Sequence, residues 1–310
     1  MLSRTAENLY WLGRNMERAE CTARMIEMAR RMAMLPGTWS DEEWRSVLKA
    51  TGCIDRLDDP DAPATEAAVL RIMMLDPDNP ASVRACLDRA RGNGRAERTR
   101  LTREMWEPLN ENWRRLEGLG VAEAQRDLAV LLDWVQQRSS QFRGATTTTM
   151  IRAEGYEFLT LGAMIERADM MLRLLDVKYW VLLPESDVVG GGRDYHQWTS
   201  VLWAASAMRA FHHVYRGDYS PWKIADFLIL NAQFPRSVAF CYNRIGVALD
   251  RLGSAHGARC DCHHTAQAMQ ARLMDSEMGE LFQEDLHAFI LDAISVTNRL
   301  SRELHRAYHF

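Results

Sequence analysis

The fold of this chain is decided by two similar stretches, Leu12-Gly13-Arg14-Asn15-Met16-Glu17-Arg18-Ala19-Glu20 and Leu161-Gly162-Ala163-Met164-Ile165-Glu166-Arg167-Ala168-Asp169. In and around both stretches, apolar residues recur every three or four positions, which is typical of a helix with one buried stripe. The match continues downstream, where Arg24 corresponds to Arg173 and Glu27 to Asp176. Because the offset stays constant at 149 residues, the sequence predicts a duplicated helical unit.

A second, charged stripe runs along both predicted helices, and the sign of the charge is kept at each position. Its members are Glu17, Glu20, Arg24 and Glu27 in the first stretch, and Glu166, Asp169, Arg173 and Asp176 in the second. An acidic residue four positions before an arginine forms a favourable pair on a helix surface. We therefore expect ion pairs between Glu20 and Arg24 and between Asp169 and Arg173.

Arg18 and Arg167 each lie on a helix face that also carries large apolar residues. A buried arginine needs an anion nearby. If the two units pack about a pseudo-twofold axis, Arg18 can pair with Glu166 and Arg167 with Glu17. The glycine of each stretch would then let the two backbones approach. This structural interpretation is the favoured one.

The alternative is that part of the cluster stays open and binds a carboxylate or a phosphate, which an arginine fork holds through two hydrogen bonds. The candidate residues for such a site, or for the ion pairs, are Glu17, Arg18, Glu20, Arg24, Glu166, Arg167, Asp169 and Arg173, with Arg4, Glu7 and Arg14 as secondary candidates. Arg14 aligns with Ala163 and Trp11 with Thr160, so any ligand site is expected to be asymmetric.

Helical patterns cover most of the chain, and no stretch shows the alternation typical of a strand. We expect helices at residues 3–34, 41–50, 65–75, 81–91, 95–116, 121–142, 150–183, 195–215, 222–230, 236–252, 265–273 and 276–308. Asn79 as N-cap before Pro80 is a start signal for the fourth of these. The predicted fold class is all-α, a multi-helix bundle built from two tandem, duplicated units related by a pseudo-twofold axis.

A further sequence match supports the duplication. Pro-x-Ser-Val occurs at residues 80–83 and again at 235–238, at a slightly larger offset, so the second copy contains a short insertion. The polar run at residues 144–149 is the expected junction between the copies. We therefore divide the chain into units at residues 1–144 and 145–310, which share one core.

The composition of the chain argues against some classes of function. The chain has 310 residues, of which 47% are hydrophobic and 26% charged, as in a globular protein. Its net charge of −4 gives no general attraction to nucleic acid or to an anionic membrane, so we expect neither as a partner. Because the sequence shows neither a signal peptide nor a long apolar segment, we expect a cytoplasmic protein with reduced cysteines.

No stretch carries a strong signal for catalysis or for a metal. Residues 260–264, Cys-Asp-Cys-His-His, resemble part of a zinc site, but no second pair of ligands lies nearby in the sequence. Glu284 and His287 have the spacing of a carboxylate-bridged di-metal site, which would need further glutamates that the chain lacks at matching positions. We expect neither a metal nor a cofactor, and we predict a helix-entry loop at residues 260–264.

Several motifs together make this chain resemble the bacterial Alpha-E domain family. They are the opening residues 1–14, Glu17-Arg18-Ala19-Glu20, residues 76–83 (Asp-Pro-Asp-Asn-Pro-Ala-Ser-Val) and Glu104-Met105-Trp106-Glu107. The resemblance implies an all-helical domain that is encoded beside, or fused to, a circularly permuted ATP-grasp protein and a transglutaminase-like protein. It also implies a shared role in forming or processing peptide or amide bonds, without an established catalytic residue in the helical domain.

The leading functional expectation is an accessory or binding protein that acts with the ATP-grasp ligase, the transglutaminase-like protein or their peptide substrate. The alternative is an enzyme in which Glu17 and Glu166 act as general acid and base. Arg18 and Arg167 would then hold a carboxylated or phosphorylated substrate. A self-associating scaffold is the third possibility, which exposed tryptophan or methionine surface would favour.

Overall fold

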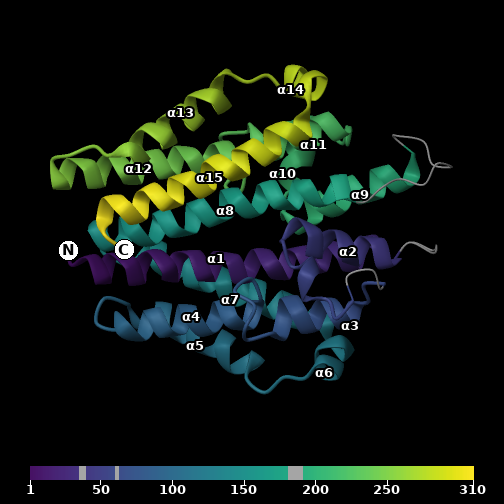
Figure 1. The fold of residues 1–310 in the computed structure, drawn as a ribbon, viewed down its shortest axis with the longest axis horizontal. Helices are drawn as coiled ribbons and strands as arrows, with labels where there is room; N and C mark the ends of the chain where they lie inside the picture. The colour runs from purple at the N-terminus through teal and green to yellow at the C-terminus, as the bar shows by residue number, and fades with distance from the viewer. Residues whose placement is uncertain (35–39, 60–62, 181–190) are drawn as a thin grey trace.

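The computed structural model describes residues 1–34, 40–59, 63–180 and 191–310. Every regular element in these ranges is helical, which confirms the predicted all-α class (Figure 1). The α-helices are α1 (Ser3–Met32), α2 (Ser40–Ala50), α3 (Glu66–Val69), α4 (Val83–Ala96), α5 (Arg103–Leu116), α6 (Val121–Arg126), α7 (Leu128–Thr149), α8 (Glu154–Trp180), α9 (Gly192–Ala204), α10 (Met208–Tyr215), α11 (Pro221–Ile229), α12 (Val238–His256), α13 (Asp261–Asp275), α14 (Met278–Glu284) and α15 (Leu286–Tyr308). A 3₁₀ turn at Ile54–Arg56 and a π-helical segment at Leu70–Leu75 complete the set.

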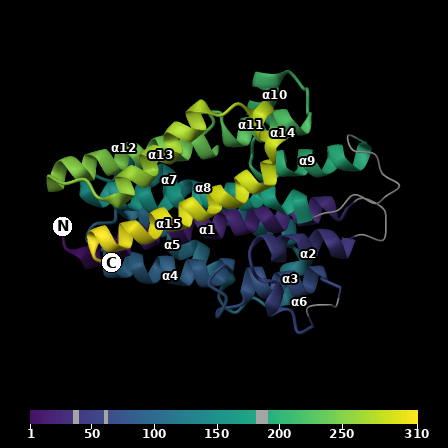
Figure 2. The ribbon, with the colours of Figure 1, turned by 45° about the horizontal axis from the view of Figure 1, so that its top comes forward.

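Helices α1 and α8 form the central pair of the bundle, and they run side by side through its middle in both ribbon views (Figures 1 and 2). On one side, α4 and α7 pack against α1, and α5 covers them. On the other side, α12 and α15 pack against α8, and α13 covers them. The two helices that carry the Glu-Arg stretches are therefore the most enclosed elements of the fold.

Two glycines permit the close approach of the central pair. A Cβ added to Gly13 would collide with the backbone carbonyl oxygen of Leu159 on α8. Conversely, a Cβ added to Gly162 would collide with the carbonyl oxygen of Tyr10 on α1. Both obstacles are backbone atoms of a packed helix, so they cannot move aside as a flexible side chain could. The backbone approach predicted from the sequence is confirmed.

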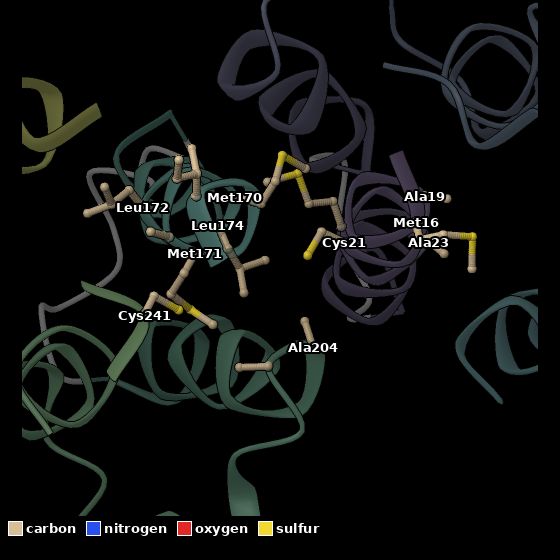
Figure 3. Packing of buried hydrophobic residues seen from close by; sticks show 14 of the residues in the cluster. Met16, Ala19, Cys21, Ala23, Met170, Met171, Leu172, Leu174, Ala204 and Cys241 are labelled. Carbon is tan, nitrogen blue, oxygen red and sulfur yellow. The ribbon is translucent and has the colours of Figure 1, made fainter. Parts of the chain in front are cut away.

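Sulfur-containing and aliphatic side chains fill the space where α8 meets its neighbours. Figure 3 shows Met171 and Leu174 of α8 near Cys21 of α1, Ala204 of α9 and Cys241 of α12. Unbranched methionine adapts to irregular gaps in a core. Between α1, α8 and α9 this packing leaves a cavity of only about 10 Å³.

The repeated Pro-x-Ser-Val sequence marks two helix starts, although not through the expected residue. Ser82 and Ser237 are the N-caps of α4 and α12, and their hydroxyl groups accept hydrogen bonds from the backbone N–H groups of Ala85 and Phe240. The prediction of Asn79 as the N-cap was wrong. Its side chain accepts from the Ala81 N–H and donates to the Ile72 carbonyl, so it closes the preceding turn instead.

Other predicted boundaries in the first half also need correction. Helix α4 continues through the glycines at residues 92 and 94 to Ala96, and the next helix starts only at Arg103, where Thr102 is the N-cap. Helix α7 begins after a break at Asp127 and runs to Thr149, so the polar run expected as a junction is helical. The hydroxyl groups of its four threonines, at residues 146–149, donate to carbonyls four residues earlier and thus need no loop.

Two predicted helices of the second half are divided. Residues 195–215 form α9 and α10, which are separated by a turn in which Ser206 has a positive φ. Residues 276–308 form α14 and α15, which are separated at Asp285. Short breaks of this kind leave the apolar periodicity on either side unchanged, so periodicity alone does not separate the two parts. None of the described helices has both the length and the apolar composition that crossing a membrane requires.

We expect the close approach of α1 and α8 to be sensitive to a single methyl group. Gly162→Ala should lower the free energy of unfolding by about 1–3 kcal/mol, because the added carbon overpacks the contact with Tyr10. Gly144→Ala on α7 is the matched control, because no atom lies within 4 Å of its added Cβ. This control should gain up to about 1 kcal/mol from helix propensity. Urea denaturation followed by circular dichroism measures both, and equal effects would contradict the packing argument.

Candidate functional site

Two reciprocal arginine forks join α1 and α8. The Arg18 Nε lies 2.5 Å from Glu166 Oε1, and its Nη2 lies 2.8 Å from Oε2. In the reverse direction, Arg167 Nε and Nη2 each lie 2.7 Å from an oxygen of Glu17. Glu17 is 2% exposed and Glu166 0%. The cross-pairing predicted from the sequence is confirmed, and both carboxylates are buried in the bundle.

The predicted intrahelical pairs are also present. Arg24 Nη2 lies 2.7 Å from Glu20, and Arg173 Nε lies 2.8 Å from Asp169. Each arginine also donates to a backbone carbonyl of the opposite half: Arg24 to Ala204 at 2.8 Å and Arg173 to Ala50 at 3.0 Å. These two bonds attach the ends of α9 and α2 to the central pair.

Two further arginines join the Glu17 side, and the sequence analysis missed both. Arg143 of α7 pairs with Glu20 and lies 3.6 Å from Glu17. Arg236, in the turn before α12, also pairs with Glu20 and lies 3.4 Å from Glu17. Arg236 occupies the variable position of the second Pro-x-Ser-Val sequence, where the first copy has alanine, and this difference was a usable signal. Nothing in the sequence around Arg143 marks it.

The ion pairs determine the protonation of the two buried carboxyl groups. Burial by itself would raise the pKa of Glu166, but the charges and hydrogen bonds of Arg18 and Arg14 lower it to about 2. Burial would also raise the pKa of Glu17, but Arg167, followed by Arg143 and Arg236, holds this pKa far below its usual range. Both groups therefore remain ionised at neutral pH.

Two arginines on the Glu17 side have surroundings that destabilise their charged form. Burial, together with the nearby charge of Arg236, lowers the pKa of Arg24 to about 9. Burial, with the charges of Arg236 and Arg167, lowers the pKa of Arg143 to about 10, although Glu17 opposes this shift. Positive charge is therefore in excess around this carboxylate.

A cavity of about 250 Å³ lies beside Glu17, between α1, α7, α8 and α12. Its lining residues are Gly13, Met16, Glu17, Ser139, Phe142, Arg143, Thr146, Thr147, Arg152, Tyr156, Leu159, Thr160, Ala163, Met164, Arg167 and Arg244. Thr147 and Arg152 are exposed, so they form the solvent side of the cavity. The cavity thus combines an apolar wall with several guanidinium groups.

The opposite side of the central pair has a side chain at the corresponding place. Arg14 Nε lies 2.7 Å from Glu166 Oε2, and its Nη1 lies 2.7 Å from Ser301 Oγ and 3.2 Å from Tyr10 Oη. The guanidinium also lies 5.5 Å from the centre of the Trp11 ring. In the alignment of the two stretches Ala163 stands opposite this arginine, and Ala163 lines the cavity.

Ser139 lies on the wall of the cavity and is buried, with 1% exposure. Its hydroxyl group has no hydrogen-bond partner among the described residues. Arg244 of α12 is half-buried on the same cavity, and no ion pair or hydrogen bond joins it to another residue within the described ranges. Two polar side chains of the cavity wall therefore lack a hydrogen-bond or ion-pair partner among the residues that the structure describes.

The other residues singled out from the sequence are the secondary candidates Arg4, Glu7 and Arg14 and the two possible metal motifs. Arg14 belongs to the cluster, whereas among the described residues no ion pair connects Arg4 or Glu7 to it. The prediction of a helix-entry loop at residues 260–264 was wrong, because α13 already begins at Asp261. Cys260 is its N-cap, and His263 accepts a hydrogen bond from the Cys260 N–H. No cluster of three metal-binding side chains occurs within the described part of the chain. The side chain of Glu284 lies outside the described residues.

Removing one charge from a reciprocal fork should destabilise the fold strongly. Glu17→Gln leaves the guanidinium of Arg167 buried without its anion, so we expect a loss of about 3–5 kcal/mol in the free energy of unfolding. Glu107→Gln, in the exposed pair with Arg103, should cause no measurable change. Urea denaturation of the two variants tests this, and an unchanged Glu17→Gln midpoint would show that the fork contributes little.

The lowered carboxyl pKa values predict how stability depends on pH. Below the usual pKa near 4.5, the unfolded chain binds protons at Glu166 that the folded chain, with a pKa of about 2, does not bind. The free energy of unfolding should therefore fall as the pH drops from about 5 toward 2. The decline should be shallower in Glu166→Gln. Urea denaturation at about pH 6 and about pH 3.5 measures the difference, and parallel declines would contradict the assignment.

Comparisons with known proteins place this architecture in a family. Residues 1–309 match Alpha-E, described as "a predicted alpha-helical domain with a conserved ER motif". Similar curated proteins are uncharacterised protein Mb2597 of Mycobacterium bovis, 24% identical over 298 residues, and uncharacterised protein Rv2567 of Mycobacterium tuberculosis, 23% identical over 298 residues. Each alignment covers 90% of this chain and 33% of the relative, so the chain spans about a third of their length. No solved structure matches it. With its two Glu-Arg pairs at the crossing of α1 and α8, this chain belongs to the Alpha-E family.

Proposed function

We propose that this chain is a binding component of a system that forms or modifies peptide or amide bonds, and that it is not a catalyst by itself. One observation carries the proposal: the two carboxylates of the Glu-Arg motifs are buried and locked in arginine forks, while an open cavity lies beside one of them. The motif thus builds a scaffold, and the cavity supplies a place for a ligand.

The state of the carboxyl groups argues against the catalytic alternative. A general acid or base works best with a pKa near the operating pH, whereas the pKa of Glu166 is about 2 and that of Glu17 is lower still. Buried thiols offer no substitute, because burial raises the pKa of Cys21, Cys86 and Cys241 to about 12. Turnover that Arg18→Lys abolished without unfolding the protein would favour the alternative.

We further propose that residues 1–144 and 145–310 are tandem copies related by an approximate twofold axis. The reciprocal forks, the reciprocal glycine contacts and the paired bonds to Ala50 and Ala204 support this origin. Since α7 ends at Thr149 and α8 begins at Glu154, the connection between the copies lies a few residues beyond the proposed boundary.

The proposed partners are a circularly permuted ATP-grasp protein, a transglutaminase-like protein and their peptide substrate. Support comes from the family resemblance and from the length of the curated relatives, in which the matching region is joined to further sequence. A cytoplasmic location belongs to the same proposal, because an ATP-grasp ligase needs ATP.

ATP consumption by the companion ATP-grasp protein tests this role. With a candidate peptide present, adding this chain should raise the rate of ATP hydrolysis, and the two proteins should co-elute from a sizing column. Reactions without the peptide, and without the ATP-grasp protein, are the controls. An unchanged rate together with separate elution would refute the accessory role.

A further inference from the structure

We propose that the cavity beside Glu17 binds a small organic anion in which a carboxylate or phosphate group adjoins an apolar portion. The proposal refines the binding role proposed above. It rests on that role because both concern the same cavity. It assigns a ligand class from the charge, the shape and the unpartnered groups of the cavity wall.

The charge of the wall is the first argument. The cavity wall carries the carboxylate of Glu17, which is in contact with two lining arginines, Arg143 and Arg167. Arg244 and Arg152 bring two more guanidinium groups to the cavity. A guanidinium fork matches the geometry of carboxylate and phosphate oxygens, so an oxyanion is the ligand group that this excess of positive charge favours.

A cationic ligand is disfavoured by the same contacts. On the opposite side, the guanidinium of Arg14 does occupy the space next to Glu166. The Glu17 carboxylate, however, already has Arg167 on both oxygens and Arg143 and Arg236 nearby. A ligand cation entering beside Arg143 and Arg244 would therefore meet like charges at close range.

The apolar wall defines the rest of the ligand. Met16, Phe142, Leu159 and Met164 line the cavity, which at about 250 Å³ suits a small molecule or the end of a peptide. A bare inorganic ion would leave this surface without contacts. An aliphatic or aromatic group beside the anion would cover it.

Ser139 provides an independent argument for a polar ligand atom. Its buried hydroxyl group faces the cavity without a hydrogen-bond partner among the described residues, whereas Ser301 on the opposite side bonds to Tyr10 and Arg14. Buried polar groups are generally hydrogen-bonded, since an unsatisfied one costs free energy. A ligand oxygen can satisfy Ser139 on the cavity wall while the charge of the ligand faces Arg143 and Arg244.

Isothermal titration calorimetry at low ionic strength tests the proposal with three probes. N-acetyl-leucine carries a carboxylate beside an apolar side chain, phenyl phosphate carries a phosphate beside a ring, and N-acetyl-leucinamide has the shape of the first without its charge. We expect at least one anion to bind, and the amide to bind at least about tenfold more weakly than its acid if the acid binds. The preferred anion distinguishes a carboxylate ligand from a phosphate ligand.

Two variants locate the site. Arg244→Gln removes a cation that no described residue neutralises, and it should weaken the binding of the anion by about tenfold or more. Ala163→Met fills the cavity without adding charge and should abolish binding. Arg251→Gln, two turns further along α12 and outside the cavity, should leave binding unchanged. Circular dichroism confirms that each variant is folded.

Either of two results overturns the proposal: neither anion binds to the wild-type protein, or binding persists unchanged in both Arg244→Gln and Ala163→Met. Tighter binding of the neutral amide than of the acid would overturn the charge argument. These outcomes are separate from the ATP-grasp assay. Anion binding without stimulation of ATP hydrolysis would refute the partner alone, and stimulation without anion binding would refute the ligand alone.

Discussion

The structure depends on four charged side chains that are largely buried between α1 and α8. Transferring Arg18, Glu166, Arg167 and Glu17 into the bundle is costly, and only forks with good geometry on both sides compensate for the lost hydration. An apolar contact would hold α1 against α8 in many registers. Paired forks with buried carboxylates are satisfied in only one, so we infer that they fix the register while the surrounding apolar residues supply most of the stability.

Much of the central architecture could be predicted from the sequence, because its cause is local and repeated. The charge stripe, the forks and the glycine contact all follow from comparing the two stretches around residues 17 and 166. The contributions of Arg143 and Arg236 could not be predicted in the same way, since they reach Glu20 from elements more than a hundred residues away. Helix breaks such as the one at Ser206 were missed because a single left-handed residue does not change the spacing of apolar residues along the sequence.

The cavity lies where the two matched sequence stretches differ. Where α1 has Arg14, α8 has Ala163. The large side chain of Arg14 occupies the space beside Glu166, whereas the small side chain of Ala163 lines the cavity beside Glu17. The serines show the same contrast, because Ser301 is satisfied by the arginine and Ser139 is not. The two matched stretches therefore differ in how much space they leave beside their glutamate.

The reciprocal forks also bear on the order of events during synthesis. The first unit leaves the ribosome with Arg18 and Glu17 on its central helix, while their partners are still untranslated. Contacts between residues so far apart in sequence form late and slowly, because a long loop must close first. Until α8 emerges, Glu17 and Arg18 of α1 lack the partners with which they form the two forks. Nascent chains stalled before residue 166 should thus remain substrates for chaperones, and a gene split between the units should yield two fragments that need each other to fold.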